Sequence, residues 1–124
     1  MKNTTIEEYQ SLARDENVVF DEKNCPMTAS MKVIGGKWKL IILNLITLNS
    51  PVRFTTLKKK IKGITQSMLS LSLRELETDG IIERKVYAEV PPRVEYTLTE
   101  RGRSLAPILR SMCDWGFRNM LEQK

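Results

Sequence analysis

A long stretch of the sequence carries basic side chains and no acidic ones. From Lys23 to Arg74 there are ten Lys and Arg residues and not one Asp or Glu. An ordinary solvated surface mixes the two signs, whereas a surface of one sign attracts a polyanion. Guanidinium and ammonium groups are also the side chains that bind phosphate. The chemistry that this stretch favours is the binding of nucleic acid.

The excess of positive charge lies in the middle of the chain. Residues 51–103 carry eleven basic and seven acidic residues, whereas residues 1–50 carry six of each and residues 104–124 carry three and two. The 124 residues have a formal net charge of +5. A chain of this length is expected to form one domain, and a small core of this kind often gains from dimerisation.

The usual patterns of catalytic and metal sites do not occur in this sequence. It has no His, no Gly-rich phosphate loop, and no Ser or Cys paired with a base, so we expect neither an enzyme nor a cofactor. Two cysteines, Cys25 and Cys113, make neither a disulfide framework nor a zinc site of ordinary spacing, so free thiols and no metal are expected. Because the N-terminus is polar and the longest apolar run is Leu40–Leu43, we expect a cytoplasmic protein without a signal peptide or membrane span.

Local signals predict a mainly α fold with one small β-hairpin. Caps, apolar periodicity and breakers place the helices as follows: from a Thr4 or Thr5 cap to an end near Asp15–Asn17, from Pro26 to Ile34, over Lys37–Thr47, from a Thr55 cap to Ile61, over Gln66–Thr78, and onward from a Thr99 cap. The alternating segments Ile82–Ala88 and Arg93–Leu98 predict the hairpin, with Pro91 and Pro92 at its tip. Val52–Phe54 is long enough only for an edge strand.

The strongest local signal is the corner before the helix Gln66–Thr78. Gly63 suits a left-handed helix stop and Thr65 suits an N-cap, so the short connection Lys62–Ile64 predicts a helix-turn-helix. In the second helix Leu69, Leu73 and Leu76 are spaced for burial, while Gly80 and Ile81 predict a Schellman ending.

The second helix of such a motif enters the major groove, so its exposed face supplies the candidate readers. Gln66, Ser67 and Ser70 are expected to meet base edges, and Arg74 to meet a guanine or a phosphate. Leu71 is either a poorly covered surface residue or a contact to a thymine methyl, whereas Met68 is expected inside the core.

Cations around this helix are candidates for contact with phosphate, which positions a protein without reading sequence. Alternatively, these cations belong to an ordinary solvated helix surface and bind nothing. On the hairpin, cations are expected to meet the narrow and strongly negative minor groove. The phosphate candidates are Arg53, Lys58, Lys59, Lys60 and Lys62, and the hairpin candidates are Lys85 and Arg93.

The last helix carries a broad apolar stripe that one small domain cannot fully cover. The expected cover is the same stripe of a second copy, which predicts a homodimer. The interface residues expected from this stripe are Leu105, Ile108, Leu109, Met112, Trp115 and Met120.

Several short motifs occur in a fixed order, and with them the chain resembles the HxlR-type bacterial transcription regulators from Cys25 to about Trp115. The motifs are Ile34–Trp38, Arg53-Phe54, Gly63-Ile64, Leu73–Glu77, Asp79-Gly80, Val90–Tyr96, and Leu98-Thr99 with Gly102. The resemblance implies a dimeric winged helix-turn-helix of MarR-like plan that binds double-stranded DNA at a palindromic operator. The family often has a basic residue and an amide near the positions of Ser67 and Leu71. This chain differs from that pattern at both positions.

Three segments follow from these expectations. Residues 1–24 form an N-terminal arm and possible dimer contact, residues 25–103 the DNA-binding domain, and residues 104–124 its dimerisation helix.

The resemblance also implies that Cys25 senses oxidants or electrophiles, helped by Lys23 and a helix N-terminus, whereas the residue alone indicates only a small half-buried side chain. Cys113 is expected to pack, and a disulfide between subunits has no assigned partner sulfur. The alternatives are a winged-helix protein-interaction module and a regulator with a small-molecule effector held between the last helix and the DNA-binding lobe.

Overall fold

The computed structural model describes residues 5–121, which divide into two compact units on either side of the boundary between Val33 and Ile34. The first unit contains α1 (Ile6–Arg14) and nearly all of α2 (Pro26–Ile34). Thr5 caps α1 by accepting a hydrogen bond from the Glu8 N–H at 3.1 Å, as expected, while the alternative cap Thr4 lies outside the described residues. The expected fold class is confirmed, because the described residues contain six α-helices and one small antiparallel sheet.

Helix α3 (Lys39–Asn49) supplies the centre of the core in the second unit. Its side chains Ile42, Leu43 and Ile46 are fully buried, and the helix contacts α5, α6 and the sheet. It begins and ends two residues later than the predicted helix Lys37–Thr47. The later start follows from the turn at Gly36, which has a φ of +98°, and from Trp38, which takes the N-cap position.

Helices α4 (Phe54–Lys60) and α5 (Gln66–Thr78) form the helix-turn-helix. The predicted Thr55 cap is wrong: the N-cap of α4 is Arg53, which makes no side-chain capping hydrogen bond. Arg53 is also the last residue of β1, so the chain passes from strand to helix without a separate capping residue.

The end of α5 is the predicted Schellman motif. The Ile81 N–H donates to the Leu76 carbonyl at 2.9 Å, and the Gly80 N–H donates to the Glu77 carbonyl at 3.0 Å. Gly80 has a φ of +75°, the left-handed conformation that this ending requires. The motif turns the chain directly into the hairpin.

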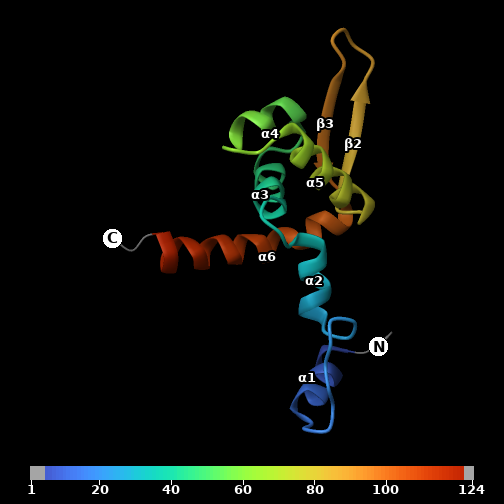
Figure 1. Cartoon of the computed structure of the whole chain (residues 1–124), viewed down its shortest axis with the longest axis vertical. Helices are drawn as coiled ribbons and strands as arrows, with labels where there is room; N and C mark the ends of the chain where they lie inside the picture. Colours follow the sequence, from blue (N-terminus) through green and yellow to red (C-terminus); the bar gives the residue numbers. More distant parts are fainter. Residues whose placement is uncertain (1–4, 122–124) are drawn as a thin grey trace. The chain divides into compact units, whose positions relative to one another are not determined.

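Three antiparallel strands form the sheet, in the order β1-β3-β2. They are β1 (Val52–Arg53), β2 (Ile82–Tyr87) and β3 (Arg93–Leu98), with β1 pairing at the edge as predicted. Pro91 and Pro92 lie in the loop between β2 and β3, where no ladder hydrogen bond is needed. In Figure 1 this hairpin projects beyond the helices of its unit, which is the arrangement of a wing.

Helix α6 (Glu100–Gly116) starts at the base of the sheet and continues into a π-helical turn, Phe117–Leu121. Thr99 caps it as predicted, accepting from the Gly102 N–H at 3.0 Å and donating to the Ile81 carbonyl at 3.0 Å. The helix contacts α3 and β3. Its C-terminal half extends away from the helix-turn-helix and the sheet (Figure 1).

Candidate nucleic-acid interface

The connection between α4 and α5 fixes where α5 begins. Gly63 has a φ of +85° and lies against the Trp38 ring, and Thr65 accepts a hydrogen bond from the Met68 N–H at 3.1 Å. Both features agree with the prediction of a glycine stop followed by a threonine cap. The glycine and the threonine cap thereby end the turn and start α5 at Gln66.

One face of α5 packs into the core. Leu69, Leu73 and Leu76 are 0–1% exposed, as their spacing predicted. An ion pair of 3.1 Å joins the Glu75 Oε1 to the Nζ of Lys39 on α3, and the Lys39 side chain is only 12% exposed. Leucine packing and this ion pair together hold the helix against α3.

The opposite face of α5 forms a shallow surface depression. The five residues that line it are those the sequence singled out as base or phosphate contacts: Gln66, Ser67, Ser70, Leu71 and Arg74. Leu71 is 43% exposed, so its apolar surface is available to a ligand. The prediction that Met68 lies inside the core is wrong. Met68 is 39% exposed because it lies one residue, about 100° of helix rotation, from the buried Leu69.

Cations flank this depression on the preceding helix and loop. Lys58, Lys59 and Lys60 form the exposed last turn of α4, and Lys62 is exposed in the loop that follows. The ion pairs found within residues 5–121 involve none of these lysines. Their charges therefore face solvent beside α5.

Arg93 on the wing is held in place rather than free. Its guanidinium pairs with Glu89 at 3.0 Å and with Glu95 at 3.5 Å, and it lies 4.0 Å from the centroid of the Tyr87 ring. The Lys85 Nζ lies over the same ring at 5.0 Å. The sequence predicted a cation reaching from the tip, but the Arg93 side chain is only 27% exposed and braces the loop at the end of β3.

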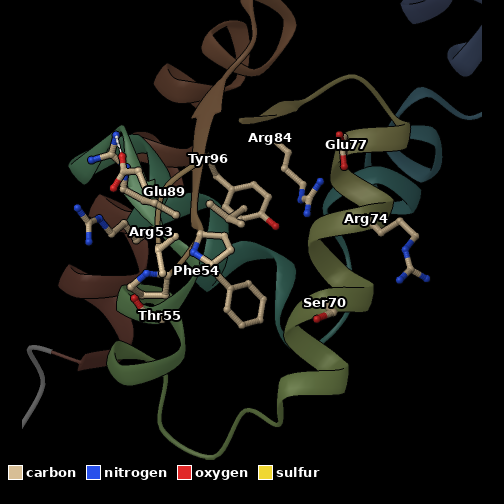
Figure 2. Close-up of a pocket in the computed structure, with 14 residues that line it drawn as sticks. Arg53, Phe54, Thr55, Ser70, Arg74, Glu77, Arg84, Glu89 and Tyr96 are labelled. Carbon is tan, nitrogen blue, oxygen red and sulfur yellow. Dashed lines mark ion pairs between the residues drawn. The ribbon is translucent and has the colours of Figure 1, made fainter. Parts of the chain in front are cut away.

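A cavity of about 740 Å³ opens between α5 and the wing. Figure 2 shows Arg84 of β2 reaching between the Tyr96 hydroxyl and α5, with Ser70 and Phe54 across the cavity. Burial raises the pKa of Tyr96, although the neighbouring Arg84 guanidinium acts in the opposite direction, so the hydroxyl keeps its proton at neutral pH. Sequence reasoning missed both residues, because only the β2–β3 register, which pairs Arg84 with Tyr96, brings them together.

Cys25 immediately precedes α2 and is half-buried. The Thr28 hydroxyl, followed by the backbone N–H groups of Thr28 and Met27, lowers the pKa of the Cys25 thiol, against an opposing effect of desolvation. The expected influence of a helix N-terminus is therefore present in these two N–H groups. The side chain that lowers the pKa of Cys25 most is Thr28, and not Lys23 as predicted.

Cys113 is exposed rather than packed, which corrects the sequence expectation. Its thiol lies 3.6 Å from the Oδ1 of Asn44 on α3 and donates a hydrogen bond to it. Both cysteines are free thiols.

The apolar stripe of α6 is largely uncovered within one chain. Ile108, Met112, Trp115 and Met120 are 43–67% exposed, whereas Leu105 is half-buried. Leu109 is only 5% exposed, so it packs into the core of its own chain and offers little surface to a partner. Two residues that the sequence analysis did not include, Phe117 and Leu121, extend the exposed stripe at 60% and 69%.

Neither a membrane span nor a metal-binding cluster is found in the described part of the chain. No helix there has the length and hydropathy needed to cross a bilayer. No group of three or more Cys, Asp or Glu side chains is close enough together to hold a metal ion.

Comparison with known proteins identifies the family. The HxlR-like helix-turn-helix family matches residues 33–124. An uncharacterized HTH-type transcriptional regulator of Halalkalibacterium halodurans is 43% identical over 109 residues, which cover 88% of this chain and 96% of that protein. The redox regulator HypR is similar in its oxidized form (49% identity, TM-score 0.72, covering 77% of this chain and 97% of HypR) and in its reduced form (48%, 0.72, 79% and 98%). The chain belongs to the HxlR-like helix-turn-helix family of transcriptional regulators.

Proposed function

We propose that this regulator binds operator DNA with α5 in the major groove and the β2–β3 wing toward the adjacent minor groove. The observation that carries the proposal is the depression on α5, which gathers on one solvent-facing surface all five contact residues predicted on that helix. The last turn of α4 carries three exposed lysines that take part in none of the ion pairs found among residues 5–121. The proposed role is binding and not catalysis.

Each side chain has a role that follows from its chemistry. Gln66, Ser67 and Ser70 read base edges by hydrogen bonding, and Leu71 packs on a thymine methyl. Arg74 bonds a guanine or a phosphate. Arg53, Lys58, Lys59, Lys60 and Lys62 bind phosphates, Lys85 approaches the backbone beside the minor groove, and Arg93 keeps the wing loop in shape.

Replacing the lysines of α4 tests the phosphate role. The triple variant Lys58→Gln, Lys59→Gln, Lys60→Gln should weaken binding to all duplexes alike and reduce the slope of log affinity against log salt by about 0.9 for each lost contact. Ser70→Ala is the matched control, because it should change sequence preference while leaving the salt slope intact. Operator fragments selected from genomic DNA and fluorescence anisotropy supply the measurement. An unchanged slope in the triple variant would contradict the phosphate role.

The protein is proposed to act as a homodimer through the exposed stripe of α6. Dimerisation would cover Trp115, Met112 and Ile108, and the operator would be a palindrome with half-sites about 34 Å apart. Light scattering at micromolar concentration should give the mass of a dimer, and Trp115→Lys should give a folded monomer. A monomeric wild-type protein at that concentration would overturn this proposal.

Cys25 is the proposed point of regulation. The favouring observation is the lowered pKa that the first turn of α2 gives this thiol, and two structures of the similar HypR differ in redox state. Oxidation or alkylation would change operator affinity by shifting the spacing of the two recognition helices. In the oxidative case two thiols give up two electrons and two protons to the oxidant and form a disulfide, whose second sulfur is unassigned.

If Cys25 is the point of regulation, the reactivity of its thiol should depend on pH, and the Thr28 hydroxyl should influence the midpoint of that dependence. A lowered pKa means that the reactive thiolate is already formed at lower pH, so in a Cys113→Ser background iodoacetamide should modify Cys25 with a midpoint below that of free cysteine. Thr28→Val should move this midpoint upward. Diamide should change operator binding of the wild type but not of Cys25→Ser, with circular dichroism unchanged. If the wild type and Cys25→Ser respond alike, the signal does not enter at Cys25.

A further inference from the structure

The cavity between α5 and the wing is open to solvent and lined with arginine. Four guanidiniums border it, those of Arg53, Arg74, Arg84 and Arg93. Glu89 and Glu95 both pair with Arg93, and Glu77 also lines the cavity. The ion pairs of the described residues do not include the other three arginines, so the cavity keeps a small excess of positive charge.

The position of the cavity on the fold restricts what can enter it. In B-DNA a sugar-phosphate strand separates each major groove from the adjacent minor groove. If α5 lies in one and the wing in the other, as proposed above, the intervening strand must pass between α5 and the hairpin. That space is the cavity of Figure 2.

We infer that this cavity is a phosphodiester-binding site, in which Arg84 and the Tyr96 hydroxyl hold one backbone phosphate between the two grooves. The inference rests on the proposed DNA-binding mode. The two side chains come from paired positions of β2 and β3, and Figure 2 places the guanidinium and the hydroxyl at the same end of the cavity. Guanidinium and phenol are both hydrogen-bond donors suited to a phosphate oxygen.

The anchoring of Arg84 distinguishes it from the surface lysines. The side chain is exposed, but it projects from a paired strand, so the sheet fixes its backbone beside Tyr96, which is only 4% exposed. Arg74 borders both this cavity and the depression on α5, so the phosphate site is continuous with the base-reading face. A guanidinium that projects from the sheet at this junction would set the register of the protein on the duplex.

Glu77 of α5 also borders the cavity, and its charge opposes anion binding there. The inference therefore makes two predictions of opposite sign. Arg84→Gln should weaken operator binding about tenfold and lower the salt slope by about 0.9, since one charged contact is lost. Glu77→Gln should tighten binding severalfold. Arg103→Gln, which removes the same charge from α6 and outside the cavity lining, is the matched control and should change affinity less than twofold.

A backbone substitution in the DNA locates the contact. A neutral methylphosphonate is placed at each phosphate of the half-site in turn, and affinities of the wild type and Arg84→Gln are compared by fluorescence anisotropy. At one phosphate between the grooves the modification should cost the wild type about tenfold and cost Arg84→Gln almost nothing, because the contact is already absent. Tyr96→Phe should lose a smaller part of the affinity at the same phosphate.

The outcomes separate this site from the proposed function. If the wild type binds no duplex DNA, the proposed function fails and the phosphodiester site fails with it. If the wild type binds but Arg84→Gln and Glu77→Gln leave affinity and salt slope unchanged, only the phosphodiester site is overturned. Benzoate serves as a probe for a small-anion site. If benzoate raises the unfolding temperature of the wild type but not of Arg84→Gln, and Arg84→Gln binds DNA as tightly as the wild type, the phosphodiester site is overturned in favour of a small-anion site. If Arg84→Gln does not fold, the response of Glu77→Gln and the methylphosphonate scan of the wild type decide.

Discussion

The two halves of α6 have similar apolar content and opposite surroundings. In the first half, taken as Glu100–Leu109, Gly102 and Leu109 are buried against the base of the sheet and the core. In the second half Met112 and Trp115 are 43% and 62% exposed, and the helix extends beyond the rest of its unit (Figure 1). One chain therefore completes the packing of the first half, whereas the second half presents an apolar surface of the kind that marks an interaction site.

The difference separates residues needed for folding from residues available for assembly. Helix α5 has the same division across its width, since its leucines are buried and its polar face is exposed. In α6 the division runs along the length of the helix as well as across it, because no residue of this helix after Leu109 is buried, while its neighbour Ile108 is exposed. Substitutions at matched positions in the two halves can therefore test the comparison directly.

The largest expected effect is at Gly102 in the first half. A Cβ there would collide with the Ile81 carbonyl oxygen and press on the Leu98 side chain at 3.1 Å. The carbonyl is backbone in the Schellman ending of α5, so it cannot move without disturbing the turn. Gly102→Ala should lower the free energy of unfolding by roughly 3 kcal/mol in urea denaturation. A loss below about 0.5 kcal/mol would mean that the first half is less tightly packed than its contacts indicate.

The ends of several helices, the start of α6 among them, were predictable from the sequence because the signals for helix ends are local. Thr99, Thr65 and Thr5 each accept the backbone hydrogen bond expected of a cap, and Gly80 takes its left-handed conformation, since such contacts join residues a few positions apart. The readers on α5 follow from the same logic, since helical periodicity alone places them on one face.

Contacts between distant segments were the ones that the sequence did not predict. The pairing of Arg84 with Tyr96 depends on strand register, and the bracing of Arg93 by Glu89 and Glu95 depends on the conformation of the wing loop. Leu109 and Ile108 are equivalent members of an apolar stripe in the sequence, and only the direction of α6 against α3 decides which is buried.

The adjacent residues Leu109 and Ile108 give the next test, with a smaller and divided effect. Leu109 is 5% exposed and Ile108 is 53% exposed. Leu109→Ala should lower the free energy of unfolding by about 2–3 kcal/mol at every protein concentration, through the cavity that it leaves. Ile108→Ala should change the stability of the isolated chain by less than about 0.5 kcal/mol but weaken dimer association about tenfold.

Urea unfolding at several protein concentrations and sedimentation equilibrium distinguish the two variants. Stability that is independent of concentration belongs to the single chain, whereas the dimer contribution grows with concentration. Equal losses from both substitutions, with the same dependence on concentration, would remove the distinction between the buried and the exposed face of α6 at this point.

The smallest effect on stability, and the only one that is a gain, is expected at Gly116 near the end of α6. A Cβ at this position meets nothing within 4 Å, in contrast to Gly102. Alanine also loses less backbone entropy than glycine on entering a helix, so Gly116→Ala should raise the free energy of unfolding by about 0.5 kcal/mol. Circular dichroism and urea unfolding at low protein concentration, where the single chain dominates, make the measurement. A loss of stability that appears only at high concentration would show that another surface approaches Gly116 closely, and this surface would have to come from a second chain. The second half of the helix would then be as closely packed as the first, completed between molecules instead of within one.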